Sequence, residues 1–91
     1  MRSASFTLYA LPNRAGQPRL GVTVSRKIGG AVERNRVKRM LREIFRYNRT
    51  ALQPSLDLVV VARSGIEKRS LADLSREFLR RCKELAGRLE T

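Results

Sequence analysis

The chain has 91 residues, with 20 Lys and Arg against eight Asp and Glu, a formal net charge of +12 and 42% hydrophobic residues. This length predicts one domain with a modest core, and the charge predicts a polyanionic partner, either a nucleic acid or an anionic membrane surface. One cysteine and no histidine exclude an internal disulfide and remove the commonest general base and metal ligand, so we expect no catalytic residue and no metal site in the protein alone.

Two strands are predicted within the first 25 residues. Ser5–Leu11 alternates between apolar and polar side chains, which places Thr7 and Tyr9 on its polar face. After a turn rich in Pro and Gly, Arg19–Ser25 alternates in the same way, with Thr23 and its last residue facing outward. We expect these strands to pair as an antiparallel hairpin whose polar faces form one floor. From the residues alone, Tyr9 is better interpreted as a partly exposed packing residue than as a platform for an unpaired base.

The segment from Ser25 to Arg49 carries nine Lys or Arg and two acids, so it contributes +7 of the net charge. Its apolar residues recur at i, i+3, i+4, i+7 and i+8, which predicts an amphipathic helix. The apolar face consists of Val37, Met40, Leu41, Ile44 and Phe45. The opposite face consists of Asn35, Arg39, Arg42, Arg46 and Arg49, with Arg36 and Lys38 beside them. Surface helices usually mix both signs of charge, and here only Glu43 interrupts the basic face, so we interpret it as a binding surface.

The start of this helix also favours an anion. Gly29–Gly30 comes just before it, and free N–H groups in a first helical turn can bind a phosphate. Arg26 and Lys27 lie before that turn, and Arg34 and Arg36 lie after it. A glycine pair alone indicates only a turn, but between two basic clusters it favours a polyphosphate.

The second half of the chain supplies a strand and a helix. The nearly continuous apolar run Leu56–Ala62, after a connection around Pro54, is typical of a strand covered on both faces. Arg63 follows it at the sheet rim, where the residues alone indicate a solvated loop arginine. The last helix has an apolar stripe, interpreted as core, made of Leu71, Leu74, Phe78, Cys82, Leu85 and Leu89. With no membrane-length apolar run and no signal-peptide pattern, we expect a cytoplasmic protein.

The basic segment resembles a known signature. Gly29–Arg39, preceded by Ser25–Lys27 and followed by Arg42-Glu43, is similar to the motif of the bacterial ribonuclease P protein component. The core of the motif is Arg34–Arg36 with the two basic residues after Val37, and the similarity continues in order over nearly the whole chain.

The resemblance implies a fold. We expect a small single-domain α+β sandwich over residues 1–91, with a central, mostly antiparallel sheet, a basic helix in a βαβ crossover and a C-terminal helix. Generic rules favour a right-handed crossover, and the family implies a left-handed one. Members usually begin with an extra basic helix, which we expect to be missing here through truncation, a misplaced start or a naturally short chain.

The resemblance also implies a function. The protein would bind the catalytic RNA of ribonuclease P, one protein per RNA, and the 5′ leader of precursor tRNA, assisting endonucleolytic leader removal. The RNA cleaves with Mg²⁺ held mainly by RNA and substrate, so the protein alone would be inactive. The residues expected to bind RNA are Arg26, Lys27, Arg34, Asn35, Arg36, Lys38, Arg39, Arg42 and Arg46. The residues expected to bind the leader are Thr7, Tyr9, Thr23, Ser25 and Arg63, and here the resemblance makes Tyr9 a stacking residue.

Other classes of protein share some of these features. A general binder of structured RNA, or a ribosomal-type protein with no role in tRNA processing, would also carry a basic helix on a small domain. A membrane-surface helix would need bulky apolar residues free to insert, and here the core needs them.

Overall fold

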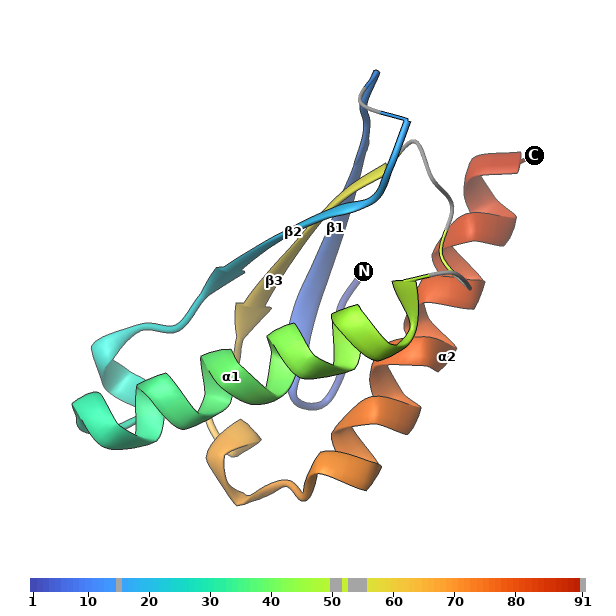
Figure 1. Cartoon of the computed structure of the whole chain (residues 1–91). Coiled ribbons are helices and arrows are strands. Elements are labelled where there is room, and N and C mark those ends of the chain that lie inside the picture. Colours follow the sequence, from blue (N-terminus) through green and yellow to red (C-terminus); the bar gives the residue numbers. More distant parts are fainter. Residues whose placement is uncertain (15, 50–51, 53–55, 91) are drawn as a thin grey trace.

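The computed structural model describes residues 1–14, 16–49, 52 and 56–90, and the side chains of the last three of these are left aside. Within these ranges the α+β class is confirmed, as Figure 1 shows. The elements follow in the order β1 (Phe6–Pro12), β2 (Arg19–Thr23), a 3₁₀ turn η1 (Arg26–Ile28), α1 (Ala31–Tyr47), β3 (Leu56–Ala62), a 3₁₀ turn η3 (Ile66–Lys68) and α2 (Leu71–Glu90).

The sheet is mixed and has the strand order β1-β3-β2. β3 runs antiparallel to β1 and parallel to β2, so the predicted hairpin between the first two strands is wrong. The most apolar strand takes the central position, and the two alternating strands become its edges. Because β2 and β3 are parallel neighbours, their connection must cross over the sheet, and α1 forms that crossover. Its left-handedness stays a prediction from the resemblance.

One face of the sheet packs on the helices and the other is open. In the register, Leu8 lies opposite Val60, which lies opposite Val22, and this row points into the core. The next row along, Tyr9 with Val59 and Gly21, points to the other face. The expectation that β3 is covered on both faces is therefore wrong, because Val59 is only half-buried.

The two helices close the core. The buried residues of α1 are Val37, Met40, Leu41 and Ile44, as the periodicity predicts, and Phe45 packs against them. From α2, Leu74, Phe78 and Cys82 are buried, with the Phe78 ring 6.2 Å from that of Phe6. Leu71, assigned to the same stripe, is instead 42% exposed. Pro54 and the side chain of Leu89 lie outside the described parts of the chain.

Candidate nucleic-acid interface

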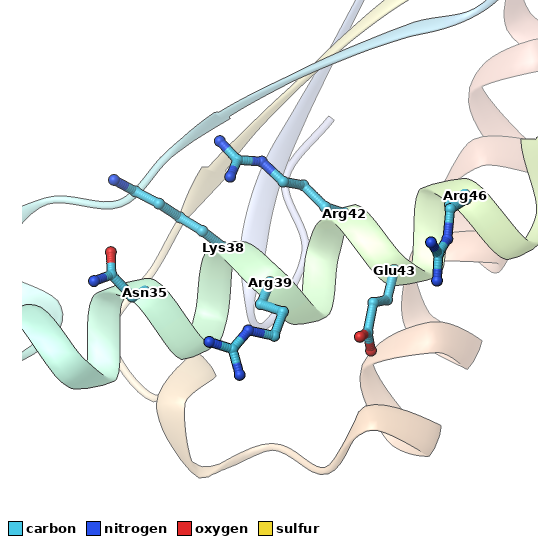
Figure 2. A pocket seen from close by; sticks show the side chains of 6 residues that line it. All are labelled: Asn35, Lys38, Arg39, Arg42, Glu43 and Arg46. Carbon is cyan, nitrogen blue, oxygen red and sulfur yellow. The ribbon is translucent and has the colours of Figure 1, made fainter.

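The basic face of α1 is positioned by the burial of the opposite face. A shallow hollow of about 440 Å³ runs along it. Its lining is Asn35, Lys38, Arg39, Arg42, Glu43 and Arg46, four cations with one carboxylate. Figure 2 shows two rows: Asn35, Lys38 and Arg42 extend to one side of the helix, and Arg39, Glu43 and Arg46 to the other. We call these six residues the α1 basic face.

The cations at its centre are available to a ligand. Lys38, Arg39 and Arg42 make no hydrogen bond or ion pair with any other residue in the described part of the chain. The Arg46 guanidinium lies 5.4 Å from the Tyr47 ring centroid, a cation–π contact that leaves its hydrogen-bond donors free. Arg49 lies beyond the helix end at Tyr47 and donates to Gln17 Oε1 at 2.7 Å, so it is not part of this face.

Two of the arginines predicted to bind RNA are partly engaged within the protein itself. Arg36 Nη2 donates to the backbone carbonyl of Glu67 in η3, and its Nη1 lies 3.8 Å from Met40 Sδ. Arg34 is half-buried, and its Nε is buried without a hydrogen-bond partner among the described residues. Arg36 therefore fastens the first turns of α1 to η3 while its remaining N–H groups stay exposed.

The start of α1 combines free N–H groups with an acid. Gly30 is the N-cap residue and supplies no side-chain hydrogen bond. Arg26 and Lys27 are exposed in η1, just before it. The Glu33 side chain, however, lies against Gly29, where it would meet any β-carbon added there. A phosphate at this helix start would share the space with that carboxylate.

The outer face of the sheet collects the residues predicted to bind the leader. Thr7 pairs with Val61, which pairs with Thr23, so the two threonines lie on one face as expected. Tyr9 lies on the same face and is 54% exposed. Between them β3 contributes Val59 and Val61, so the floor is apolar at its centre and polar at its edges.

An open hollow of about 480 Å³ lies beside Tyr9 at the β1 edge of the sheet. Its lining combines Tyr9, Leu11, Val59 and Val61 of the outer face with Met1, Leu8, Ala10 and Leu85. Sequence reasoning missed the two valines, because β3 has the composition of a doubly covered strand. Val59 and Val61 are as apolar as the buried residues that alternate with them, so the sequence of β3 does not show that one of its faces is open.

The acid on this face is neutralised. Asp57 accepts from Arg19 Nε at 2.7 Å and Nη2 at 2.9 Å, and from Asn13 Nδ2 at 2.7 Å. The hydrogen bond from Arg19, followed by that from Asn13, holds the pKa of Asp57 below its ordinary value. The outer face therefore presents no unpaired carboxylate within the described strands.

Arg63 is tied to the N-terminal segment and is not a freely solvated loop residue. Its Nη1 donates to the Ser3 carbonyl at 2.6 Å, and its backbone N–H donates to the Ser5 carbonyl at 3.0 Å. Ser25, the other predicted residue at this end, is exposed just beyond β2. These hydrogen bonds hold the Arg63 guanidinium, with its remaining N–H donors, at the carboxyl ends of β2 and β3.

Two other kinds of site are absent from the described residues. No three His, Cys, Asp or Glu side chains come together there in a group that could hold a metal ion. No helix in those ranges is long and apolar enough to span a lipid bilayer.

Known proteins of one family match this sequence and fold. The sequence model of the family described as Ribonuclease P matches residues 1–86. The ribonuclease P protein component of Syntrophus aciditrophicus is 44% identical over 73 residues, 80% of this chain. That of Pseudoalteromonas atlantica is 43% identical over 89 residues, 97% of this chain. The chain spans 61% of the length of the first relative and 73% of the second.

Solved structures agree with the sequence comparison. The RNase P protein from Thermotoga maritima superposes with a TM-score of 0.86 at 30% identity, covering 92% of this chain and 80% of that chain. The Staphylococcus aureus RNase P protein gives a TM-score of 0.80 at 29% identity, covering 94% of this chain and 78% of that chain.

Proposed function

Because this chain belongs to the bacterial ribonuclease P protein family, we propose that it acts as the protein subunit of ribonuclease P and takes part in the maturation of tRNA 5′ ends. One protein binds each catalytic RNA through the α1 basic face, and the outer face of the sheet binds the 5′ leader of precursor tRNA. Catalysis resides in the RNA subunit, and the protein alone is inactive.

The observation that carries the RNA-binding proposal is the state of the central cations of α1. Lys38, Arg39 and Arg42 have no partner among the described residues, although the helix beneath them is fixed by its buried face. Arginine forks bind phosphate oxygens bidentately, and a fixed helix presents them without further ordering of the backbone. The deep, narrow major groove of A-form RNA resists reading of base edges, so α1 recognises RNA shape and phosphate spacing. Arg26, Lys27, Arg34 and Arg36 extend this contact beyond the α1 basic face at the helix start.

The leader-binding proposal rests on the outer sheet face. Tyr9 is an exposed ring beside an apolar floor, and RNA-binding sheets use such rings to stack unpaired bases. Thr7 and Thr23 at the edges of that floor can donate to or accept from the sugar and phosphate groups. Ser25 and Arg63 continue the face at the carboxyl ends of β2 and β3.

The protein assists cleavage by positioning and by screening charge. No histidine occurs in the chain, and we assign no proton transfer to any of its residues. Magnesium ions held by the RNA and the substrate supply the charge and the activated water for cleavage. Cations of α1 placed against RNA phosphates reduce the repulsion between the catalytic RNA and its substrate.

Reconstitution tests this function directly. Purified protein should leave precursor tRNA intact in the presence of Mg²⁺, and should increase Mg²⁺-dependent leader removal when a bacterial ribonuclease P RNA is added at low salt. Cleavage by the protein alone, in a preparation freed of contaminating nucleases, would contradict the assignment of catalysis to the RNA.

A competition experiment separates this function from the other candidates. Labelled ribonuclease P RNA bound to the protein is challenged with unlabelled ribonuclease P RNA, ribosomal RNA, duplex DNA and anionic vesicles. We expect ribonuclease P RNA to compete best at physiological salt, where non-specific electrostatic binding weakens steeply. Equal competition by ribosomal RNA would favour a general structured-RNA binder or a ribosomal-type protein.

A further inference from the structure

Gly21 lies in the middle of β2, where neither the backbone nor the packing requires a glycine. Its φ is not positive, unlike those of Gly16 and Gly65. A β-carbon added at Gly21 would meet only Val59 Cγ2, at an ordinary contact distance of 3.8 Å. Glycine inside a strand weakens it, and it often marks a place where a ligand approaches the backbone closely. Gly21 therefore weakens β2, and no feature of the folded chain requires a glycine at this position.

Gly21 lies in the same row of the outer sheet face as Tyr9. Tyr9 pairs with Val59, and Val59 pairs with Gly21, so the three residues form one row across the outer face. Neighbouring strands lie about 4.8 Å apart, which places the Cα atoms of Tyr9 and Gly21 roughly 10 Å apart. The tyrosine ring rises on one side of Val59, and no side chain rises on the other.

The gap is local. In the two adjacent rows, β2 carries Arg19 and Thr23 on the same face. Gly21 therefore opens a slot one residue wide between two side chains, with the half-buried Val59 as its floor. A flat ring that stacks on Tyr9 from this side would occupy the slot.

We propose that Gly21 is a specificity-determining residue of the leader-binding face, and that its missing side chain makes room for an unpaired nucleobase stacked on Tyr9 above Val59. The inference deepens the proposed leader binding and rests on it. The occupant is single-stranded RNA, because the slot is too narrow to take a base that remains paired in a duplex. A base enters only where its strand is unpaired, and the 5′ leader is the unpaired segment that precursor tRNA carries and mature tRNA lacks.

Charge supports a nucleic acid over an apolar peptide in this slot. The chain carries a net charge of +12, and the carboxylate of Asp57 in the next row is held by Arg19 and Asn13. At the other end of the face, Arg26 and Arg63 follow β2 and β3. The phosphates on either side of a stacked base would thus meet cations and no free acid.

The test fills the slot and leaves the rest of the face unchanged. Gly21→Ala and Gly21→Val add one and three carbons above Val59. Gly87, exposed on α2 with no atom within 4 Å of an added β-carbon, provides the matched glycine controls Gly87→Ala and Gly87→Val. Particles are assembled from each variant and a bacterial ribonuclease P RNA, and their affinities for precursor and mature tRNA are measured together with the melting temperature of each free protein.

We expect Gly21→Val to reduce the preference for precursor over mature tRNA by roughly five- to a hundredfold, the range that corresponds to losing one base stacked on an aromatic ring. Gly21→Ala should reduce the preference less, and both Gly87 variants should leave it unchanged. The melting temperatures of the Gly21 variants should be equal to or higher than that of the original chain, because Ala and Val lose less backbone entropy in a strand.

Two results would overturn the inference, and they differ in what else they remove. If Tyr9→Ala loses the preference and folded Gly21→Val keeps it, the leader-binding face stands and the slot is wrong. If particles with the original chain show no preference for precursor tRNA, the proposed leader binding is wrong and the slot falls with it. If Gly21→Val melts at a lower temperature than the original chain, Gly21→Ala replaces it in the test, because its single added carbon makes only an ordinary contact with Val59 Cγ2. A folded Gly21→Ala that keeps the full preference for precursor tRNA would then overturn the inference.

Discussion

Ser5 and Glu77 are joined by two hydrogen bonds that connect the two ends of the chain. The Ser5 backbone N–H donates to Glu77 Oε2 at 2.9 Å, and the Ser5 hydroxyl donates to Oε1 at 2.7 Å. The Ser3 hydroxyl donates to the same carboxylate, and both serines are buried. Because the Ser3 carbonyl also accepts a hydrogen bond from Arg63, the carboxylate of α2 fixes the segment that holds an arginine at the edge of the proposed leader-binding face.

Removing this carboxylate should destabilise the domain. Glu77→Ala leaves the buried hydroxyls and the N–H group without their acceptor, which costs about 1–3 kcal/mol of unfolding free energy. The control is Glu84→Ala on the same helix, whose pairing with Arg81 is exposed and contributes less than about 1 kcal/mol. Urea unfolding followed by circular dichroism measures both. Equal decreases in the two variants would show that the Ser5–Glu77 contact contributes no more than a surface ion pair.

The same carboxylate should make stability depend on pH. Burial raises the pKa of Glu77, but hydrogen bonds from Ser3 and Ser5 and the charge of Arg69 outweigh it, so the pKa lies below its ordinary value of 4.5. A group with a lowered folded-state pKa contributes stability that is complete above the unfolded pKa and is lost as the pH falls through the folded one.

Glu77→Gln isolates this contribution. The difference in unfolding free energy between the original chain and the variant should be constant above about pH 6. It should shrink as the pH falls through the ordinary glutamate pKa of 4.5 towards the lower pKa of the folded state. Asp57 and Asp73, whose pKa values are also lowered, remain in both proteins and cancel in the difference. A difference that does not change with pH would mean that Glu77 keeps its ordinary pKa in the folded chain.

The α1 basic face should account for much of the salt dependence of RNA binding. In Arg39→Ala/Arg42→Ala, two cations without intramolecular partners are removed and the core is untouched. Each RNA phosphate that is no longer neutralised reduces the slope of log K against log salt by roughly 0.7–0.9, so the slope of the double variant should fall by about 1.4–1.8. Arg76→Ala/Arg80→Ala on α2 removes the same charge elsewhere and should change the slope less. Equal changes of the slope in the two double variants would show that RNA binding responds to net charge in general and not to the α1 basic face.

The helix that carries this face could be predicted from the sequence because its evidence is local. The spacing of Val37, Met40, Leu41 and Ile44 determines which side is buried, and the positions of the exposed cations follow from the same 3.6-residue period. The end of the helix does not follow from that period, since Arg49 continues the pattern but lies beyond Tyr47.

The order of the strands could not be predicted in this way. Two alternating strands separated by a short turn favour a hairpin, yet β3, which follows β2 only after the whole of α1, inserts between them. That choice depends on the burial of a central apolar strand, which is a property of the whole core. The hydrogen bonds from Arg36 to Glu67 and from Arg63 to Ser3 likewise join residues 31 and 60 positions apart. The periodicity of a helix or strand relates only nearby residues, so it cannot predict such contacts.

Cys82 should be chemically inert in the folded chain. Burial of the thiol, whose residue is 8% exposed, raises its pKa to about 12. The thiolate is the reactive form, so at about pH 8 almost none of it is available. A thiol reagent should label the folded protein slowly and the urea-unfolded protein at the rate of a free cysteine. Fast labelling without denaturant would show that this part of α2 opens readily.

Tyr9 should contribute to leader recognition and not to docking of the catalytic RNA. Its ring is exposed on the outer sheet face, and α1 packs against the opposite, buried side of the same sheet, so a change at one surface leaves the other in place. Tyr9→Ala should lower the preference of the assembled particle for precursor over mature tRNA by roughly five- to a hundredfold, and Tyr9→Phe should keep most of it, because stacking uses the ring and not the hydroxyl. The affinity for ribonuclease P RNA should stay within about twofold in both variants, since Tyr9 makes none of the phosphate contacts assigned to α1.

The matched control is Tyr47→Ala, which removes the 74% exposed tyrosine at the end of α1 and should leave the preference for precursor unchanged. If Tyr9→Ala keeps the full preference in particles that bind RNA normally, the ring packs against the sheet without contacting the leader.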